Sequence, residues 1–292
     1  MTTTPRVWAM EEILDLDRYP IHQPDSAGYA AARDEARTSL RGDGCAVLKD
    51  LVRPEALAAM SAESHAIKPA THYSEMKINA YFGTEPDPTL PEHHPGNVFI
   101  ERSSGFTPGD AFPDDSPIDA MYRWEPLLAF VADCLEIPAL YCYSDPLACL
   151  TINVLNPGQQ FSWHYDNNDF AVTVLLDEAD DGGLFRYAPN IRSREDENAD
   201  AAAAVMLGDD TPVTTLDLRP GDMQIFQGRY SLHEVTRVGP DSKPRHAAVF
   251  AYTLEDGLIG GLVRTEQLFG RTLPIHHEYA AGQAVREDAL LD

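Results

Sequence analysis

The sequence predicts a mainly β protein with flanking helices, of the α+β class, whose core is a jelly roll. From residue 140 onward, short runs rich in β-forming residues are separated by turn residues such as those at 219–222. Eight such runs are found, at 140–143, 149–155, 171–176, 184–187, 213–217, 223–227, 232–236 and 246–253. Short strands at this spacing indicate two packed antiparallel sheets, which is the jelly-roll arrangement.

The first part of the chain instead shows helical signals. Residues 1–24 are expected to be irregular, and a helix capped by Ser26 then runs to about Arg41, with Gly42 as its stop. A short strand follows at 45–49, and a second helix begins at Pro54 and ends near residue 68. We expect these helices to wrap the β core.

Three further segments complete the prediction. Residues 69–115 show little periodicity, so we expect a lid or binding loop there, or short elements that the pattern does not reveal. Ser116 opens a helical stretch to about residue 137, which Pro126 should divide in two. The alanine-rich segment 192–210 predicts a helix inserted between strands.

We predict a single domain over residues 1–292. It comprises a mostly helical N-terminal part with a loop or lid (about 1–139), the jelly-roll core (about 140–256) and a C-terminal segment (257–292). The four cysteines lack a C-x-x-C pairing, so we expect buried thiols rather than disulfides or a zinc knuckle.

Charge and the N-terminal residues limit the partners. The formal net charge of −25 argues against nucleic acid and an anionic membrane surface as partners, because both require a basic protein face. Neither a long apolar run nor a signal-peptide pattern is present in the sequence, so we expect a cytoplasmic protein. A small molecule is the expected partner.

The chemistry is concentrated in His164-x-Asp166 and the distant His233. In an extended segment, residues i and i+2 share a face, so His164 and Asp166 can point at one centre. Two histidines and one carboxylate form a facial triad that suits Fe(II) and leaves positions open for other ligands. The alternative is a zinc hydrolase, in which the same three residues bind zinc and water takes the open position.

Arg245 follows His233 and opens an apolar strand that can carry its side chain inward. A dicarboxylate co-substrate that chelates iron at one end needs a cation for its far carboxylate. Arginine offers a planar, bidentate and permanently charged partner, so we assign Arg245 this role. Lys243 is the second candidate.

Together these residues resemble the iron(II)/2-oxoglutarate-dependent oxygenases. The resemblance extends over about residues 116–256. Within this class, the sequence is most similar to the bacterial group of free or N-acyl amino-acid hydroxylases and halogenases. It rests on Tyr143-Ser144-Asp145-Pro146, Asn153-Val154, Trp163-His164-Tyr165-Asp166-Asn167, Phe170-Ala171-Val172-Thr173, Gly182-Gly183, Tyr187-Ala188-Pro189-Asn190-Ile191-Arg192 and Gly228-Arg229-Tyr230-Ser231-Leu232-His233.

The resemblance implies a double-stranded β-helix (cupin-like) core, with Fe(II), 2-oxoglutarate and O₂ as cofactor and co-substrates. It implies that Asn153 hydrogen-bonds 2-oxoglutarate. Halogenases of this group have Gly or Ala in place of the carboxylate ligand, which leaves room for chloride. Because Asp166 fills that position here, hydroxylation is the expected outcome.

Two residues are candidates for binding the substrate. Arg102, in the 69–115 region, is positioned to hold a substrate carboxylate, and Asn167 to orient a substrate amine. Arg186 stands where relatives are expected to carry an acidic residue. If Arg186 faces the pocket, we expect the charge of the substrate to differ from that of the amino-acid substrates of this group. The other histidines are interpreted as surface or structural residues.

We therefore expect a 2-oxoglutarate-dependent dioxygenase that hydroxylates an unactivated C–H bond of a small polar metabolite, most simply an amino acid or its derivative. Succinate and CO₂ are the co-products. A radical halogenase of the same fold, a zinc hydrolase and a non-enzymatic jelly-roll binding protein are the alternatives.

Overall fold

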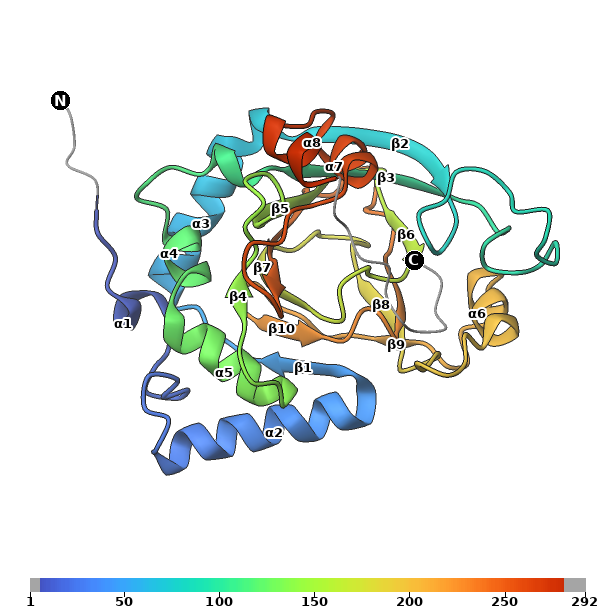
Figure 1. Ribbon diagram of the computed structural model, residues 1–292. Helices are drawn as coiled ribbons and strands as arrows, with labels where there is room; N and C mark the ends of the chain where they lie inside the picture. The colour runs from blue at the N-terminus through green and yellow to red at the C-terminus, as the bar shows by residue number, and fades with distance from the viewer. Residues whose placement is uncertain (1–5, 281–292) are drawn as a thin grey trace.

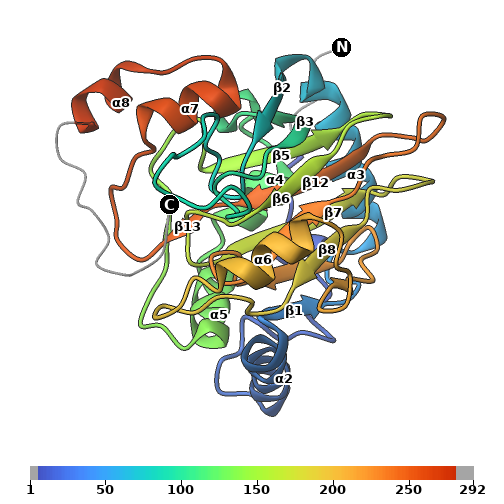
Figure 2. The same cartoon turned by 90° about the vertical axis from the view of Figure 1, so that its right-hand side faces the viewer.

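Two antiparallel sheets form the body of the protein (Figures 1 and 2). The computed structural model describes residues 6–280. The larger sheet has the order β1-β10-β7-β12-β5-β3-β2, and the smaller one β6-β11-β8-β9. The larger comprises β1 (Cys45–Leu48), β10 (Met223–Phe226), β7 (Ala171–Asp177), β12 (Arg245–Phe250), β5 (Leu150–Leu155), β3 (Ile100–Thr107) and β2 (His72–Ile78). The smaller comprises β6 (Phe161–His164), β11 (Leu232–Val235), β8 (Phe185–Ala188) and β9 (Thr214–Thr215).

The sheets face each other, as an edge-to-face contact of 4.8 Å between Phe226 of the larger sheet and His233 of the smaller one shows. The predicted jelly-roll core with flanking helices is confirmed. A short pair, β4 (Tyr141–Cys142) and β13 (Tyr252–Thr253), lies apart from both sheets. No helix within residues 6–280 is long and apolar enough to cross a membrane.

Helices cover one face of the larger sheet. They are α1 (Met10–Ile13), α2 (Ala27–Asp43), α3 (Pro54–Ile67), α4 (Pro117–Tyr122) and α5 (Glu125–Leu135). The principal hydrophobic core lies between these helices and the sheet, and includes Ile152, Val154, Val172, Val174 and Ile225 of the strands. This packing fixes which face of each strand points outward, because successive side chains of a strand alternate between its faces.

The opposite face of the larger sheet therefore points at the smaller sheet. Phe106, Asn153 and Ala247 lie directly across from one another on β3, β5 and β12, so their side chains share this inner face. By alternation, Arg102 on β3 and Arg245 on β12 share it as well.

Two predicted boundaries are corrected. Helix α2 continues to Asp43 and ends at Gly44, whose left-handed φ of 67° and N–H bond to the Leu40 carbonyl (3.0 Å) make it the cap in place of Gly42. The helical stretch after Ser116 is indeed divided, but the break lies at Arg123 and Trp124. Pro126 sits in the first turn of α5, where its missing N–H leaves no bond unmade.

The 69–115 region is not a plain loop, because it contains β2 and β3. These strands escape pattern recognition because three consecutive buried residues of β3 are the polar Arg102, Ser103 and Ser104. Strands β1, β2 and β3 all belong to the larger sheet, so this sheet is not built from residues 140–256 alone. Strand β6, which ends in His164, was also missed.

The predicted inserted helix is confirmed in shorter form as α6 (Ala199–Met206). Two further helices, α7 (Leu262–Phe269) and α8 (Pro274–Tyr279), lie in the C-terminal segment. Helix α7 packs beside β2 and β3, at the edge of the larger sheet (Figure 1). The four cysteines are free thiols, as predicted, and Cys142 is only half-buried.

Candidate iron site

The structure brings His164, Asp166 and His233 together between the two sheets. His164 and His233 are directly paired across β6 and β11, with ring centroids 4.1 Å apart. Asp166 Oδ1 lies 3.8 Å from His164 Nε2 and 3.5 Å from His233 Nε2. The donor atoms all lie within 4.8 Å of one another, which places two imidazole nitrogens and one carboxylate oxygen around one point. This donor set fits Fe(II).

Asp166 is held in place by the loop before β11. Its N–H donates to the Gly228 carbonyl (3.1 Å). A Cβ at Gly228 would lie 1.9 Å from Asp166 Oδ2, so only glycine leaves room for the carboxylate there. The Gly228-to-His233 segment thus positions both the carboxylate and the second histidine.

Both histidines present Nε2 to the site. The Nδ1–H of His164 donates to the Ser162 carbonyl (2.7 Å), and that of His233 to the Ser231 carbonyl (2.9 Å). Because a carbonyl can only accept, Nδ1 is protonated and Nε2 is left as the metal-binding nitrogen. Burial, and then the neighbouring His233, lower the pKa of His164 well below its usual value, so it stays neutral.

The carboxylate is also in its metal-binding form. Burial opposes ionisation of Asp166, but His233, His164 and Arg264 outweigh it and lower the pKa of Asp166. The triad is walled by aromatic rings: Phe161 stacks on His164 at 4.0 Å, and Phe82 lies 5.2 Å from the same ring. Such walls limit the access of water.

Arg245 is buried, with 6% of its surface exposed, and is on the inner face of β12. Within residues 6–280 it makes no hydrogen bond or ion pair, and burial lowers its pKa to about 10. Lys243, the second candidate, is exposed and ion-paired with Asp180 at 2.7 Å. The predicted strand position of Arg245 thus places an uncompensated cation in the interior, where Lys243 does not reach.

The remaining predicted site residues occupy different surroundings. Asn153 is buried on the inner face and donates to the Gly105 carbonyl at 3.4 Å. Asn167 lies exposed in the loop after β6. Arg102 is buried, with 1% of its surface exposed, and its Nε donates to Ser104 Oγ at 3.1 Å.

Arg186 does not face the pocket. Its neighbour Tyr187 is paired with His233, so Arg186 points to the other side of the smaller sheet, where it bonds Asp210 and lies 3.2 Å from Glu234. Its charge is satisfied there and gives no information on the substrate. Sequence order alone could not reveal this, because it depends on the register between β8 and β11.

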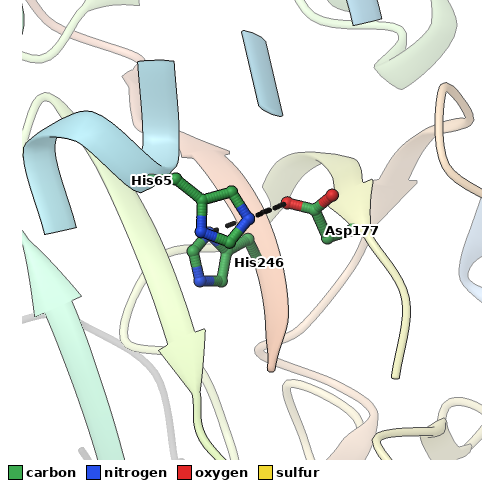
Figure 3. Close-up of side chains that lie close together, drawn as sticks. All are labelled: His65, Asp177 and His246. Carbon is green, nitrogen blue, oxygen red and sulfur yellow. Dashed lines mark ion pairs between the residues drawn. The ribbon is translucent and has the colours of Figure 1, made fainter. Parts of the chain in front are cut away.

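A second group of possible metal ligands lies on the outer side of the larger sheet (Figure 3). His65 Nε2 is 3.3 Å and His246 Nδ1 is 3.8 Å from Asp177 Oδ2. Hydroxyls already occupy this group, because Ser61 donates to Asp177 Oδ1 (2.8 Å) and Ser64 is bonded to His246 Nδ1 (2.9 Å). We interpret it as a structural contact between α3, β7 and β12.

Arg264 on α7 is the site residue that the sequence did not indicate. Its guanidinium lies 3.4 Å from the centre of the Phe82 ring, and it influences the pKa of both Asp166 and His164. No local pattern marks it, because α7 reaches the site only through its packing on β2 and β3.

Comparisons with known proteins agree with this fold. Residues 111–276 match the model of a family described as halogenase D. Among solved structures, AviO1 from Streptomyces viridochromogenes has a TM-score of 0.52 and 16% identity, covering 78% of this chain and 95% of its own. The epimerase SnoN, solved with Fe³⁺, alpha ketoglutarate and nogalamycin RO, has a TM-score of 0.50 and 13% identity, covering 77% of this chain and 84% of its own. No curated protein matches the chain.

The fold and the triad define an enzyme of the iron(II)/2-oxoglutarate-dependent oxygenase class. Since the matched model spans more than half of the sequence, the chain belongs to the halogenase D family.

Proposed function

We propose that the protein is an Fe(II)/2-oxoglutarate-dependent hydroxylase of a C–H bond in a small polar metabolite, such as an amino acid or its derivative. The observation that carries the proposal is the Asp166 carboxylate, which completes the triad with His164 and His233. The second support is Arg245, a buried cation with no partner within residues 6–280. A binding protein without catalysis has no need of both features.

Each residue has a defined task in this proposal. His164, Asp166 and His233 hold the iron, and Arg245 pairs with the far carboxylate of 2-oxoglutarate. On β5, Arg245 is paired with Leu155, and Asn153 lies two residues before Leu155 on the same face of the sheet as Arg245. The side-chain amide of Asn153 supplies a further hydrogen bond to the co-substrate. When bound, iron and 2-oxoglutarate supply the O₂-dependent oxidation that places one oxygen atom on the substrate and yields succinate and CO₂.

The chain itself contributes position and exclusion of water. Phe161 and Phe82 fix the ring of His164, and Gly228 sets the position of Asp166. Arg102 holds an anionic group of the substrate, and Asn167 lies at the exposed rim, where it can meet a substrate amine. Holding the C–H bond near the metal in one orientation lowers the barrier by reducing the entropy lost on reaction.

Anaerobic addition of Fe(II) and 2-oxoglutarate tests the centre directly. The wild type should develop a weak visible charge-transfer band, and His164→Ala should lose it. His22→Ala, an exposed histidine, is the matched control and should keep the band. A wild type that forms no band and consumes no 2-oxoglutarate with amino acids, N-acyl amino acids or nucleotides contradicts the proposal, and stoichiometric zinc with activity independent of O₂ would favour a hydrolase.

A radical halogenase is the second candidate, because the matched family model is described as halogenase D. It is disfavoured by Asp166, whose carboxylate occupies the position that halide requires. Asp166→Gly should abolish hydroxylation and is the variant in which chloride could enter. Mass spectrometry of products formed in chloride buffer decides the matter: the wild type should add one oxygen, whereas a chlorinated product would establish the halogenase.

A further inference from the structure

Two arginines, Arg102, which is buried, and Arg264, which is half-buried, lie beside the candidate iron site. Arg102 lies 5.0 Å from the centre of the Phe161 ring, and Arg264 lies 3.4 Å from that of Phe82. Both rings contact the imidazole of His164. The two guanidiniums come from β3 and from α7, which pack together at the edge of the larger sheet (Figure 1).

Neither guanidinium is fully bonded. One terminal nitrogen of each, Nη2 of Arg102 and Nη1 of Arg264, is buried and has no hydrogen-bond partner within residues 6–280. Burial lowers the pKa of Arg102 to about 10, and no carboxylate within residues 6–280 counters it. Burial, together with repulsion from Arg102, lowers the pKa of Arg264 to about 9, and Asp166 is the one opposing group in the part of the chain that the structure describes. A buried charge without a partner is costly, so such groups point to a missing anion.

Charge balance indicates how much negative charge is missing. This step rests on the proposed function. Iron(II), Asp166, Arg245 and doubly charged 2-oxoglutarate together carry no net charge. The two positive charges of Arg102 and Arg264 then remain, in an interior that cannot screen them. A ligand group with two negative charges would neutralise them.

We propose that Arg102 and Arg264 form one anion subsite, and that the substrate carries a dianionic group, either a phosphate monoester or a pair of carboxylates. The flat, forked donors of two guanidiniums match such oxygen-rich groups. Arg264 thereby becomes a specificity-determining residue, and its position on α7 makes the C-terminal segment part of the substrate site.

Anaerobic titration calorimetry with inorganic phosphate, on protein loaded with Fe(II) and 2-oxoglutarate, tests the subsite without relying on turnover. The wild type should bind phosphate, and Arg102→Gln and Arg264→Gln should each weaken binding at least tenfold. Arg271→Gln is the matched control, because Arg271 is exposed and pairs with Asp110. It should bind phosphate within twofold of the wild type. Equal binding by the wild type and both subsite variants would overturn the proposal.

A second measurement separates binding from a structural role. Arg102→Met keeps an apolar stem against Phe161 but removes the buried charge. The ligand-free melting temperature should hold or rise, while the upward shift caused by phosphate is lost. A melting temperature that falls by more than about 5 °C, with phosphate stabilisation retained in Arg264→Gln, would show two structural arginines instead.

Matched ligands identify the source of the charge. O-phosphoserine is compared with serine, and glutamate with glutamine, by displacement of phosphate. Tighter binding of O-phosphoserine than of glutamate assigns a phosphate monoester, and the reverse order assigns a dicarboxylate. If serine and glutamine displace phosphate as well as their charged counterparts, the dianion requirement is wrong.

The two proposals fail separately. Phosphate binding without a charge-transfer band would leave the subsite standing and remove the iron oxygenase. A band without phosphate binding would leave the oxygenase and remove the subsite.

Discussion

At the scale of single residues, the site is a balance of buried charges. Asp166 stays ionised because His233, His164 and Arg264 outweigh its burial, and both histidines stay available because their Nδ1–H groups are bonded to carbonyls. Arg245 has no such compensation within residues 6–280. Its charge is therefore the feature that a bound dicarboxylate is expected to neutralise.

Arg245→Gln should raise the KM for 2-oxoglutarate by about tenfold to a hundredfold, because a charge-assisted hydrogen bond contributes about 1.5–3 kcal/mol. Initial rates of succinate formation at varied 2-oxoglutarate measure the change. Lys243→Gln is the control, because Lys243 lies just before the same strand. This variant loses only an exposed ion pair, so the KM for 2-oxoglutarate should be nearly unchanged. The opposite ranking of the two variants would transfer the role to Lys243.

At the scale of elements, the three residues of the triad are positioned by two strands and one loop. β6 and β11 pair His164 with His233, and the loop before β11 brings Gly228 against Asp166. Gly228 offers no ligand atom, but its lack of a side chain leaves room for the Asp166 carboxylate.

Gly228→Ala should therefore displace Asp166 and weaken Fe(II) binding, seen as loss of the anaerobic charge-transfer band. Gly42→Ala is the matched control, because an added Cβ on this exposed turn of α2 meets nothing within 4 Å. That variant should keep the band and gain about 0.5–1 kcal/mol of stability from helix propensity. A normal band in Gly228→Ala would mean that the loop can move without cost.

The contact between α3, β7 and β12 gives a prediction for acid stability. Burial, and then His65, lower the pKa of His246 to about 4, whereas an unfolded histidine titrates near 6.5. The unfolded state thus binds the proton more readily, so this stability is present above pH 6.5 and is lost as the pH falls toward 4.

Between pH 7 and pH 4, the wild type should lose up to about 3 kcal/mol more unfolding free energy than His246→Asn. This value follows from the fall of the His246 pKa from 6.5 to about 4 on folding. Urea unfolding of both proteins at several pH values measures this difference. Parallel losses in the two proteins would show that His246 is not responsible.

At the scale of the whole molecule, the net charge of −25 opposes the approach of anionic ligands. The local cations Arg245, Arg102 and Arg264 are expected to favour their binding. Salt shortens the range of the global field to about 8–10 Å near physiological ionic strength, while the buried contacts are screened less.

The kcat/KM for 2-oxoglutarate should consequently rise as sodium chloride increases from about 10 to about 150 mM. The same trend is expected for a dianionic substrate, and no increase for a neutral one. A steep fall with salt would mean that a positive local field, not the global charge, governs association.

The sequence by itself determined the features that depend on neighbours along the chain. The His164-x-Asp166 spacing, the Ser26 cap, Pro54 at the start of α3 and most strands of the smaller and larger sheets follow from local chemistry and alternation. The jelly-roll class and the inward strand position of Arg245 follow from the same patterns.

Only the tertiary structure decided which side of a strand meets the site. β3 lacks the apolar alternation that marks a strand, because its consecutive buried residues Arg102, Ser103 and Ser104 are polar. The outward direction of Arg186 depends on the pairing of β8 with β11, and the arrival of Arg264 depends on how α7 packs. Contacts between residues far apart in the chain are fixed by sheet register and packing, which no local pattern encodes.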